Sequence, residues 1–390
     1  MESRRKTEIR TIAEKNRIVN RIRDVILERD GFLLLGHKDP DTDCIASLVS
    51  FALLLGKFHK EITIYLAGPV MAHFSYLLAI CKYNGISVLY GKTPNIKSFS
   101  TVVILDTPKP DMISLNEEIA ALLADKDIRK IEIDHHLEGD ASCTGDEGYC
   151  LLSEASSTCE LIGYILLKLS KQKDKIQAND LFTRNLALSI ITGIVGDSKM
   201  GKYLKTRKEK FYYRIFTDIF DKLLGEKTLK GSKNLSSMEA VFDTIQNFSV
   251  QEKKCFDGIM DLKNTNEPIY YICMGAEQSA KFFRNFDAEL IVNVSKAAAD
   301  TLAEDCGKLG LVAYYDDPSL SDYIQFRLRR SSKYLSVDLR TVLPHLSIEN
   351  GGGHPGAIGF RVKKDTVNDI TGYIKDIVER IDKFFGEISI

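Results

Sequence analysis

The chemistry that this sequence can support is concentrated in aspartate and histidine residues of its first half. One short segment, Gly36–Asp43, has the sequence Gly-His-Lys-Asp-Pro-Asp-Thr-Asp and directly follows an apolar run. Side chains this close together on a turn can converge on one point, and two alternating aspartates can reach neighbouring metal ions. Taken alone, the segment fits a solvated acidic turn with a helix N-cap equally well. Its candidate metal ligands are His37, Asp41 and Asp43.

Three further places in the first half carry the same residue types. Asp106 ends one strand-like run, Asp134-His135-His136 ends another, and Asp197 closes an apolar stretch of helical pattern. Each is a weak signal alone, because an aspartate after a strand is often a turn residue or a helix cap. A histidine pair, likewise, is often part of a surface turn. Adjacent histidines usually point in different directions, so one can bind a metal ion while the other meets a substrate.

The coincidence of these four places predicts a metal centre. In an open parallel sheet, ligands bind at the carboxyl ends of the strands, and three of the four places fall at predicted strand ends. A mixture of imidazole and carboxylate ligands suits manganese, iron or zinc better than calcium. Two such ions close together suit phosphoryl chemistry, because they polarise the phosphate, generate hydroxide and stabilise the leaving oxygen.

The second half of the chain offers groups that suit phosphate. Alternation along the predicted strand 323–329 places Arg327 and Arg329 on one face, and Arg330 follows. Arginine makes bidentate phosphate contacts, although a charged edge strand is the plainer interpretation. A sharper pattern is the segment Gly351–Gly356, which contains three successive glycines and then a histidine. Glycines let the backbone approach an anion closely, and the histidine can add a hydrogen bond or a charge.

An α/β fold must position the residues of the first half. Short apolar runs alternate with helical patterns, which is typical of a parallel sheet covered on both faces. Isoleucines at near-helical spacing over residues 9–26 predict an N-terminal amphipathic helix. We expect strands at Phe32–Gly36, Ile62–Ala67, Thr101–Leu105 and Lys130–Ile133, and helices at Cys44–Leu55, His73–Tyr83, Ile113–Ala124, Ser157–Leu169 and Leu181–Val195.

The length of 390 residues predicts two or three domains, and the pattern along the chain favours two. Residues 225–237 are rich in Gly, Lys and Ser without periodic apolar residues, and they form the predicted linker. We expect a catalytic domain with its N-terminal helix at 1–224 and a smaller α/β domain at 238–390. In this second domain we expect strands at Ile269–Met274, Leu290–Val294, Leu309–Tyr314 and Tyr323–Leu328, and a final helix near Thr366–Phe384.

Composition and sequence patterns argue against several classes of partner and location. A formal net charge of −1 creates no overall field that would recruit nucleic acid. The eight cysteines contain no Cys-x-x-Cys pair, and we interpret them as reduced residues of a cytoplasmic protein. The segment Met1–Arg29 lacks the apolar core of a secretory signal. No run approaches the roughly 18–20 apolar residues of a membrane span, so we expect no membrane partner.

Together, these motifs resemble those of the DHH phosphoesterase family, in which a DHH catalytic domain precedes a DHH-associated C-terminal domain. The resemblance covers residues 32–384 and rests on five motifs in the family's order. The four aspartate and histidine places are similar to the motifs of the catalytic domain, and Gly351–His354 to the glycine–histidine motif of the second domain. The chain resembles the branch of nanoRNases, adenosine 3′,5′-bisphosphate (pAp) phosphatases and cyclic di-AMP phosphodiesterases.

The resemblance implies two divalent metal ions, manganese in the first place, with iron, cobalt, zinc or magnesium as alternatives. Asp106 would bridge the two ions, His136 would face the scissile phosphate, and Asp134 would orient a histidine. A metal-bound water or hydroxide would be the nucleophile. The remaining ligands would be His37 and Asp41 for one ion, and Asp43, His135 and Asp197 for the other.

In the second domain the resemblance implies a group of residues that holds the substrate's remote phosphate. The active site would then lie in a cleft between the two domains. The family's arginine motif is Arg-Ser, whereas this chain has Arg329-Arg330-Ser331, which leaves the register open by one residue. The residues of this group would be Arg329 or Arg330, Gly351, Gly352, Gly353 and His354.

We therefore expect a phosphoesterase that hydrolyses phosphodiester or phosphomonoester bonds of short RNA, pAp, or linear or cyclic dinucleotides. An exopolyphosphatase or inorganic pyrophosphatase is the alternative, and a catalytically silent nucleotide-binding regulator is a minor one. Long duplex nucleic acid is not expected as a substrate. Long-chain exonucleases of the family usually carry additional nucleic-acid-binding domains, and we recognise no such domain in this sequence. The charged segment Lys199–Lys230 is compatible with three roles, namely a solvated face, the rim of the substrate site or a homodimer contact.

Overall fold

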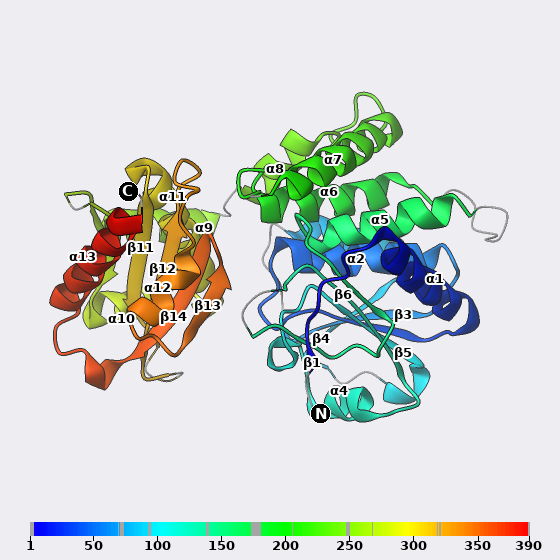
Figure 1. Ribbon diagram of the computed structural model, residues 1–390, viewed down its shortest axis with the longest axis horizontal. Coiled ribbons are helices and arrows are strands. Elements are labelled where there is room, and N and C mark those ends of the chain that lie inside the picture. The colour runs from blue at the N-terminus through cyan, green and yellow to red at the C-terminus, as the bar shows by residue number, and fades with distance from the viewer. Residues whose placement is uncertain are drawn as a thin grey trace. The chain divides into compact units, whose positions relative to one another are not determined.

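The chain forms two compact units, Met1–Asn247 (unit 1) and Phe248–Ile390 (unit 2), in a computed structural model (Figure 1). The structure describes residues 4–68, 70, 74–92, 95–137, 140–172, 181–204, 206–246, 250–266, 268–317, 319 and 321–388. Among these residues no helix is both long enough and apolar enough to cross a membrane. The segment 225–237 lies within unit 1, and its first three residues belong to a helix.

Unit 1 is built on a six-stranded sheet in which all neighbouring strands run parallel, in the order β4-β3-β2-β5-β6-β8. The predicted parallel α/β fold is confirmed, and β4 and β8 extend the sheet beyond the four expected strands. The strands are β2 (Phe32–Leu35), β3 (Ile62–Leu66), β4 (Ser87–Tyr90), β5 (Thr101–Leu105), β6 (Arg129–Asp134) and β8 (Cys150–Leu152), with a separate antiparallel pair β1 (Arg4–Arg5) and β7 (Ser142–Cys143).

Helices cover both faces of this sheet, as the apolar strands predict. Successive side chains of a strand point to opposite faces, so Leu34 enters a large core while Leu33 and Leu35 enter a smaller one. The large core includes buried residues of α1, α2, α5 and α6, whereas the smaller includes α4. The helices are α1 (Ile12–Glu28), α2 (Thr42–Gly56), α3 (Ser75–Tyr83), α4 (Glu117–Ala124), α5 (Thr158–Ser170), α6 (Arg184–Ser198), α7 (Arg207–Lys227) and α8 (Met238–Gln246), with 3-10 turns at Ile96–Ser98 and Pro110–Met112.

Unit 2 contains a mixed six-stranded sheet with the order β13-β14-β12-β11-β10-β9. Only β10 and β11 pair in parallel. Along β12, Ile324, Phe326 and Leu328 are fully buried in one core, which confirms the predicted alternation. The elements are β9 (Lys263–Asn264), β10 (Tyr270–Met274), β11 (Leu309–Tyr315), β12 (Tyr323–Arg330), β13 (Gly351–His354), β14 (Ala357–Lys363), α9 (Val250–Met260), α10 (Ala276–Asn285), α11 (Ala288–Cys306), α12 (Val342–His345), α13 (Ile370–Ile388) and 3-10 turns at Leu339–Thr341 and Lys364–Thr366.

The predicted strand Leu290–Val294 is wrong, because these residues lie in helix α11. Three of its five residues, Ile291, Val292 and Val294, are β-branched, which favours a strand when only five residues are considered. The longer pattern decides otherwise. Ile291, Val294, Ala298 and Leu302 recur at helical spacing and are all buried against β10 and β11.

Close contact between α2 and α6 brings distant parts of unit 1 together. Gly193 of α6 lies against α2 and α5, where an added Cβ would overlap Cys159 Sγ and lie 2.5 Å from Asp43 Oδ1. A glycine in a helix interior normally lowers stability relative to alanine. Here it is the residue that leaves room for the Asp43 carboxylate.

We expect Gly193→Ala to lower the free energy of unfolding by about 1–3 kcal/mol, because the methyl group overpacks this contact. Gly225→Ala in α7 is the matched control, since its Cβ would approach nothing closer than Ser236 O at 3.4 Å. The control should raise the free energy of unfolding by about 0.5–1 kcal/mol. Urea unfolding followed by circular dichroism measures both, and equal stability of the two variants would contradict the packing argument.

Candidate metal centre

The first predicted segment runs from the end of β2 into the first turn of α2. Asp41 is the N-cap of α2, and its Oδ1 accepts hydrogen bonds from the backbone amides of Asp43 and Cys44, both at 3.1 Å. His37 Nε2 lies 3.7 Å from the same oxygen. Asp41 can therefore be both a helix cap and a metal ligand, because the same carboxylate caps α2 and faces the ring of His37.

Asp43 is fully buried and is held by the N-terminus of α5. Its Oδ2 accepts a hydrogen bond from Thr158 N at 2.6 Å, and its Oδ1 accepts one from Cys159 N at 3.1 Å. Backbone amides at a helix N-terminus stabilise an anion. The charge of Asp43 is thus partly compensated from a segment 115 residues further along the chain.

Asp106 directly follows β5 and adopts the left-handed backbone conformation, with φ of 51°. Non-glycine residues rarely adopt this conformation, and such residues cluster at functional sites. Its side chain is buried, and Oδ1 accepts a hydrogen bond from Thr158 Oγ1 at 2.9 Å. Thr158 therefore contacts both Asp43 and Asp106, a role that no feature of the sequence indicated.

His135 follows β6 and faces three carboxylates. Its Nδ1 lies 3.1 Å from Ala155 O, which can only accept, so Nδ1 donates and Nε2 faces the acids. Nε2 lies 3.5 Å from Asp106 Oδ1, 3.5 Å from Asp197 Oδ2 and 4.0 Å from Asp43 Oδ2. This orientation is the one that a metal-binding histidine requires.

Asp134 and His136 form a second arrangement beside this one. His136 Nδ1 donates to Asp134 Oδ1 at 2.7 Å, and the backbone amide of His136 donates to the same oxygen at 3.2 Å. Asp134 is fully buried, whereas the His136 side chain keeps 17% of its surface exposed. The predicted orienting role of Asp134 is geometrically available, because its Oδ1 holds both the ring Nδ1 and the backbone amide of His136.

The six predicted ligands come together as two overlapping groups, which we call the carboxylate–histidine cluster. Asp106 Oδ2 lies 3.9 Å from His37 Nε2, while Asp106 Oδ1 lies 3.5 Å from His135 Nε2. One oxygen of this carboxylate thus faces each histidine, as a ligand shared by two ions would. The cluster consists of His37, Asp41, Asp43, Asp106, His135 and Asp197.

The protonation of the cluster fits a cation site. Burial, with repulsion from Asp197 and Asp41, raises the pKa of Asp43 to about 6 although His135 opposes the shift. Burial and the neighbouring carboxylates Asp43 and Asp41 also raise the pKa of Asp106. Burial lowers the pKa of His135, but the charges of Asp197, Asp43 and Asp134 outweigh it and raise the value to about 9. A divalent ion would offset this repulsion directly. The imidazole and carboxylate donors of the cluster suit manganese, iron, cobalt or zinc.

The predicted phosphate-binding residues lie in unit 2. Arg329 Nη1 donates to Leu328 O and Ile358 O, both at 3.0 Å, and its Nε lies 3.4 Å from Asp300. Arg330 is 2% exposed and donates to the carbonyl of Leu335 at 3.2 Å and to that of Val337. Both arginines therefore have partners within their own unit.

The predicted glycines form the edge strand β13 of unit 2. Gly353 has φ of 139°, and an added Cβ would overlap Ala357 O, so this position requires glycine. Gly352 is exposed, and a Cβ there would meet nothing within 4 Å, which leaves the backbone open to a ligand. Gly351 is exposed as well. The backbone of His354 belongs to β13, but its side chain lies outside what the structure describes.

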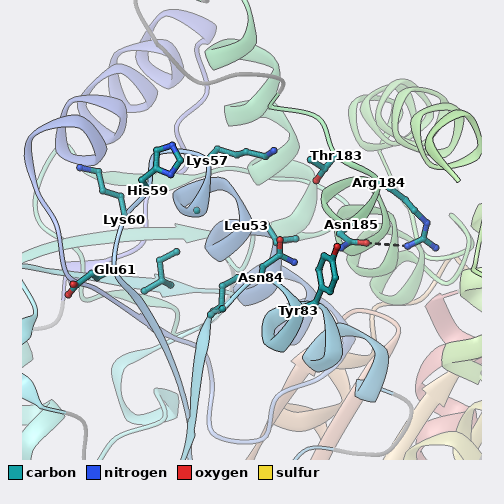
Figure 2. Close-up of a pocket in the computed structure, with 14 residues that line it drawn as sticks. Leu53, Lys57, His59, Lys60, Glu61, Tyr83, Asn84, Thr183, Arg184 and Asn185 are labelled. Atoms are coloured by element: carbon teal, nitrogen blue, oxygen red, sulfur yellow. Dashed lines mark hydrogen bonds between the residues drawn. The ribbon is translucent and has the colours of Figure 1, made fainter.

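A pocket of about 760 Å³ lies at the opposite end of α2 and α6 from the cluster (Figure 2). Lys57, His59 and Tyr83 are among its lining residues, together with Arg184 at the start of α6. Arg184 donates to Thr228 Oγ1 at 3.0 Å and to Leu235 O at 2.7 Å. The pocket contains none of the predicted site residues.

Residues 32–194 match the sequence model described as "DHH family, N-terminal domain". No curated protein matches the sequence. In structure the chain is similar to an exopolyphosphatase-related protein from Bacteroides fragilis, with 16% identity, a TM-score of 0.69, and coverage of 99% of this chain and 100% of that one. A pGpG-specific phosphodiesterase, PggH, from Vibrio cholerae aligns over 91% of this chain and 99% of that one, with 12% identity and a TM-score of 0.38. The first similarity shows a shared fold.

Metal binding should release protons from the cluster. With a pKa of about 9, His135 is protonated in the metal-free chain at neutral pH, whereas a metal ligand must be the neutral imidazole. We expect titration calorimetry with Mn²⁺ near neutral pH, in buffers of different ionisation enthalpy, to show release of about one proton. The release should fade as the pH rises through the pKa of His135.

Asp106→Asn should lose most of this Mn²⁺ binding, because the substitution weakens the donor that faces both histidines. His59→Gln, which changes an exposed histidine at the remote pocket, serves as the control and should bind Mn²⁺ normally. Mn²⁺ binding without proton release, or normal binding by Asp106→Asn, would contradict the ligand set.

Proposed function

Residues 32–194 form a DHH family N-terminal domain, and on this premise we propose that the carboxylate–histidine cluster hydrolyses phosphoester bonds of short nucleotides. The family consists of metal-dependent phosphoesterases, so the protein is a hydrolase acting on phosphoric esters. The proposed substrates are oligoribonucleotides, pAp, and linear or cyclic dinucleotides. The observation that carries the proposal is Asp106, whose two oxygens face His37 and His135.

Two divalent ions, which we propose to be Mn²⁺, would be held by His37 and Asp41 on one side and by Asp43, His135 and Asp197 on the other. Asp106 would contribute one oxygen to each. When bound, such ions polarise a phosphate and lower the pKa of bound water. The backbone amides at the N-terminus of α5 hold Asp43 in place, and the Thr158 hydroxyl holds Asp106 in place, before any substrate binds.

His136 is the residue that we propose to contact the scissile phosphate. Its Nδ1 is fixed by Asp134, so its Nε2 can donate a hydrogen bond to a phosphate oxygen. The side chain is the more exposed of the two adjacent histidines, at 17% against 9% for His135. We therefore propose that the ring of His135 binds a metal ion and that the ring of His136 contacts the substrate.

Unit 2 is proposed to take the remote phosphate of the substrate. Gly351 and Gly352 offer an exposed backbone on the edge strand β13, which suits an anion. Arg329 donates to Ile358 O of β14, the strand that pairs with β13, and Arg330 donates to Val337 O. We propose that these arginines turn toward the substrate when it binds. That both units act on one substrate in a shared cleft stays a prediction.

Hydrolysis of inorganic polyphosphate or pyrophosphate is the second candidate. Lys38 is exposed and directly follows His37, and Lys199 is the C-cap of α6, two residues after Asp197. Such lysines would suit an anionic chain that carries no base. The Bacteroides fragilis protein with the shared fold is described as exopolyphosphatase-related.

A substrate panel separates these candidates. We expect the Mn²⁺-loaded protein to hydrolyse di- to pentanucleotide RNA, pAp or linear pApA faster than polyphosphate or pyrophosphate, as measured by product chromatography and phosphate release. Asp106→Ala should lower kcat by about 10³-fold, because it removes several kcal/mol of metal-dependent stabilisation. Asp140→Asn, an exposed carboxylate, is the control. Phosphate release from polyphosphate with nucleotides untouched would decide for the second candidate, and full activity of Asp106→Ala would reject the site.

His136→Gln should lower kcat by about 10²-fold while leaving Mn²⁺ affinity close to that of the unaltered protein, because His136 is proposed to face substrate. His135→Gln should instead lose Mn²⁺ affinity. Steady-state kinetics and metal titration on both variants measure this contrast. Equal loss of metal by the two variants would contradict the division of roles.

A further inference from the structure

A lysine from the segment that precedes the DHH domain lies inside unit 1. Strand β1 pairs with β7, and the next residue, Lys6, donates its backbone amide to Ala141 O at 3.0 Å. Lys6 is 4% exposed. Its Nζ contacts Asp134 Oδ2, lies 2.8 Å from Glu132 Oε1 and donates to Thr107 O at 2.6 Å.

A buried ammonium group is unfavourable unless it is paired and hydrogen-bonded. Lys6 meets this condition, because Glu132 and Asp134 are two residues apart on β6 and project from the same face. Burial acts to lower the pKa of Lys6, but the charges of Asp134 and Glu132 raise it well above its ordinary value. Lys6 is therefore a fixed positive charge behind the carboxyl ends of the central strands.

Glu132 anchors the lysine from one side. Its Oε2 accepts hydrogen bonds from Thr144 N and Gly145 N, both at 2.7 Å, and from Cys143 Sγ at 3.1 Å. This carboxylate is fixed by the backbone of the turn after β7. Its other oxygen pairs with Lys6, so the position of the ammonium is determined by groups outside the carboxylate–histidine cluster.

From that anchored position, Lys6 contacts both motifs at the centre of the site. Asp134 turns Oδ2 to Lys6 and Oδ1 to His136 Nδ1 at 2.7 Å. The carbonyl of Thr107, which accepts from Lys6, belongs to the residue immediately after Asp106. One ammonium group thus joins the turn that carries the shared carboxylate to the acid that orients the substrate-facing histidine.

We propose that Lys6 is a positioning residue of the hydrolytic site, which fixes the Asp134 carboxylate and through it the ring of His136. The inference rests on the proposed function for its effect on turnover, but not for its effect on His136. Because Lys6 precedes residues 32–194, this part of the site comes from outside the matched DHH domain. A purely structural lysine would affect folding and leave His136 and kcat unchanged.

The test compares Lys6→Met, Lys6→Arg and Lys130→Met in the full chain. Lys130 is a matched control, since it is a buried lysine at the other end of β6 that donates to the carbonyls of Ile128 and Asp125. We expect Lys6→Met to lower kcat by about 10–100-fold with little change in KM, and Lys6→Arg to recover part of the loss. Lys130→Met should keep kcat at the unaltered value even where it lowers the unfolding midpoint.

A second readout requires neither substrate nor metal. In ¹⁵N-histidine-labelled protein, Lys6→Met should shift the ring resonances of His136, assigned with His136→Gln, while those of His59 stay unchanged. Lys130→Met should leave both in place. Unchanged His136 resonances or unchanged kcat in folded Lys6→Met overturns the proposal. If the unaltered protein hydrolyses no phosphoester, the proposed function fails while the resonances still decide the role of Lys6.

If Lys6→Met does not fold, the same test can be made in a Glu132→Gln background. Removing one of the two carboxylates relieves the unbalanced negative charge that the lysine leaves behind. The double variant Lys6→Met/Glu132→Gln is then compared with Glu132→Gln alone. A lower kcat and shifted His136 resonances in the double variant support the positioning role, and identical values overturn it.

Discussion

Repulsion between buried carboxylates is the constraint around which unit 1 is arranged. Asp43 and Asp106 are buried at the carboxyl edge of the sheet, and Asp197 faces the same histidine. Burial raises the pKa of all three carboxyl groups, and repulsion from the nearby Asp41 carboxylate raises each of them further. A fold that brings acids together in this way loses stability unless positive charge or hydrogen-bond donors accompany them. The hydrogen-bond donors around the cluster offset part of this repulsion, and a bound divalent cation would offset the remainder.

Hydrogen-bond donors and one ammonium group compensate the negative charge of the cluster and of the acids beside it. The N-terminus of α5 donates two backbone amides to Asp43, and the Thr158 hydroxyl donates to Asp106. On the other side Lys6 balances Glu132 and Asp134, which are not part of the cluster. Asp43, Asp106 and Asp134 therefore have a defined orientation before a metal or substrate binds, which is the property that preorganised catalytic sites share.

Helix packing sets the distances between these groups. α2 begins at the cluster and α6 ends there, and glycine at position 193 lets the two helices approach around the Asp43 side chain. The other ends of the same helices form the pocket at Lys57 and Arg184, which contains none of the predicted residues. The shared fold with a protein at 16% identity shows that this architecture tolerates wide change in sequence.

The sequence by itself determined the parallel α/β fold, the four aspartate and histidine segments that contribute to the cluster and the alternation along β12, because these follow from local patterns. Strands such as β2 and β5 are continuous apolar runs, and parallel strands place whatever follows them at one edge of the sheet. Local patterns failed for Leu290–Val294, where five residues fit a strand but the longer helical spacing prevailed. Only the tertiary structure decided the roles of Thr158 and Lys6 and the partners of Arg329 and Arg330. Lys6 and Asp134 are 128 residues apart, and an isolated lysine in a charged N-terminal segment carries no sign of burial until the sheet has formed around it.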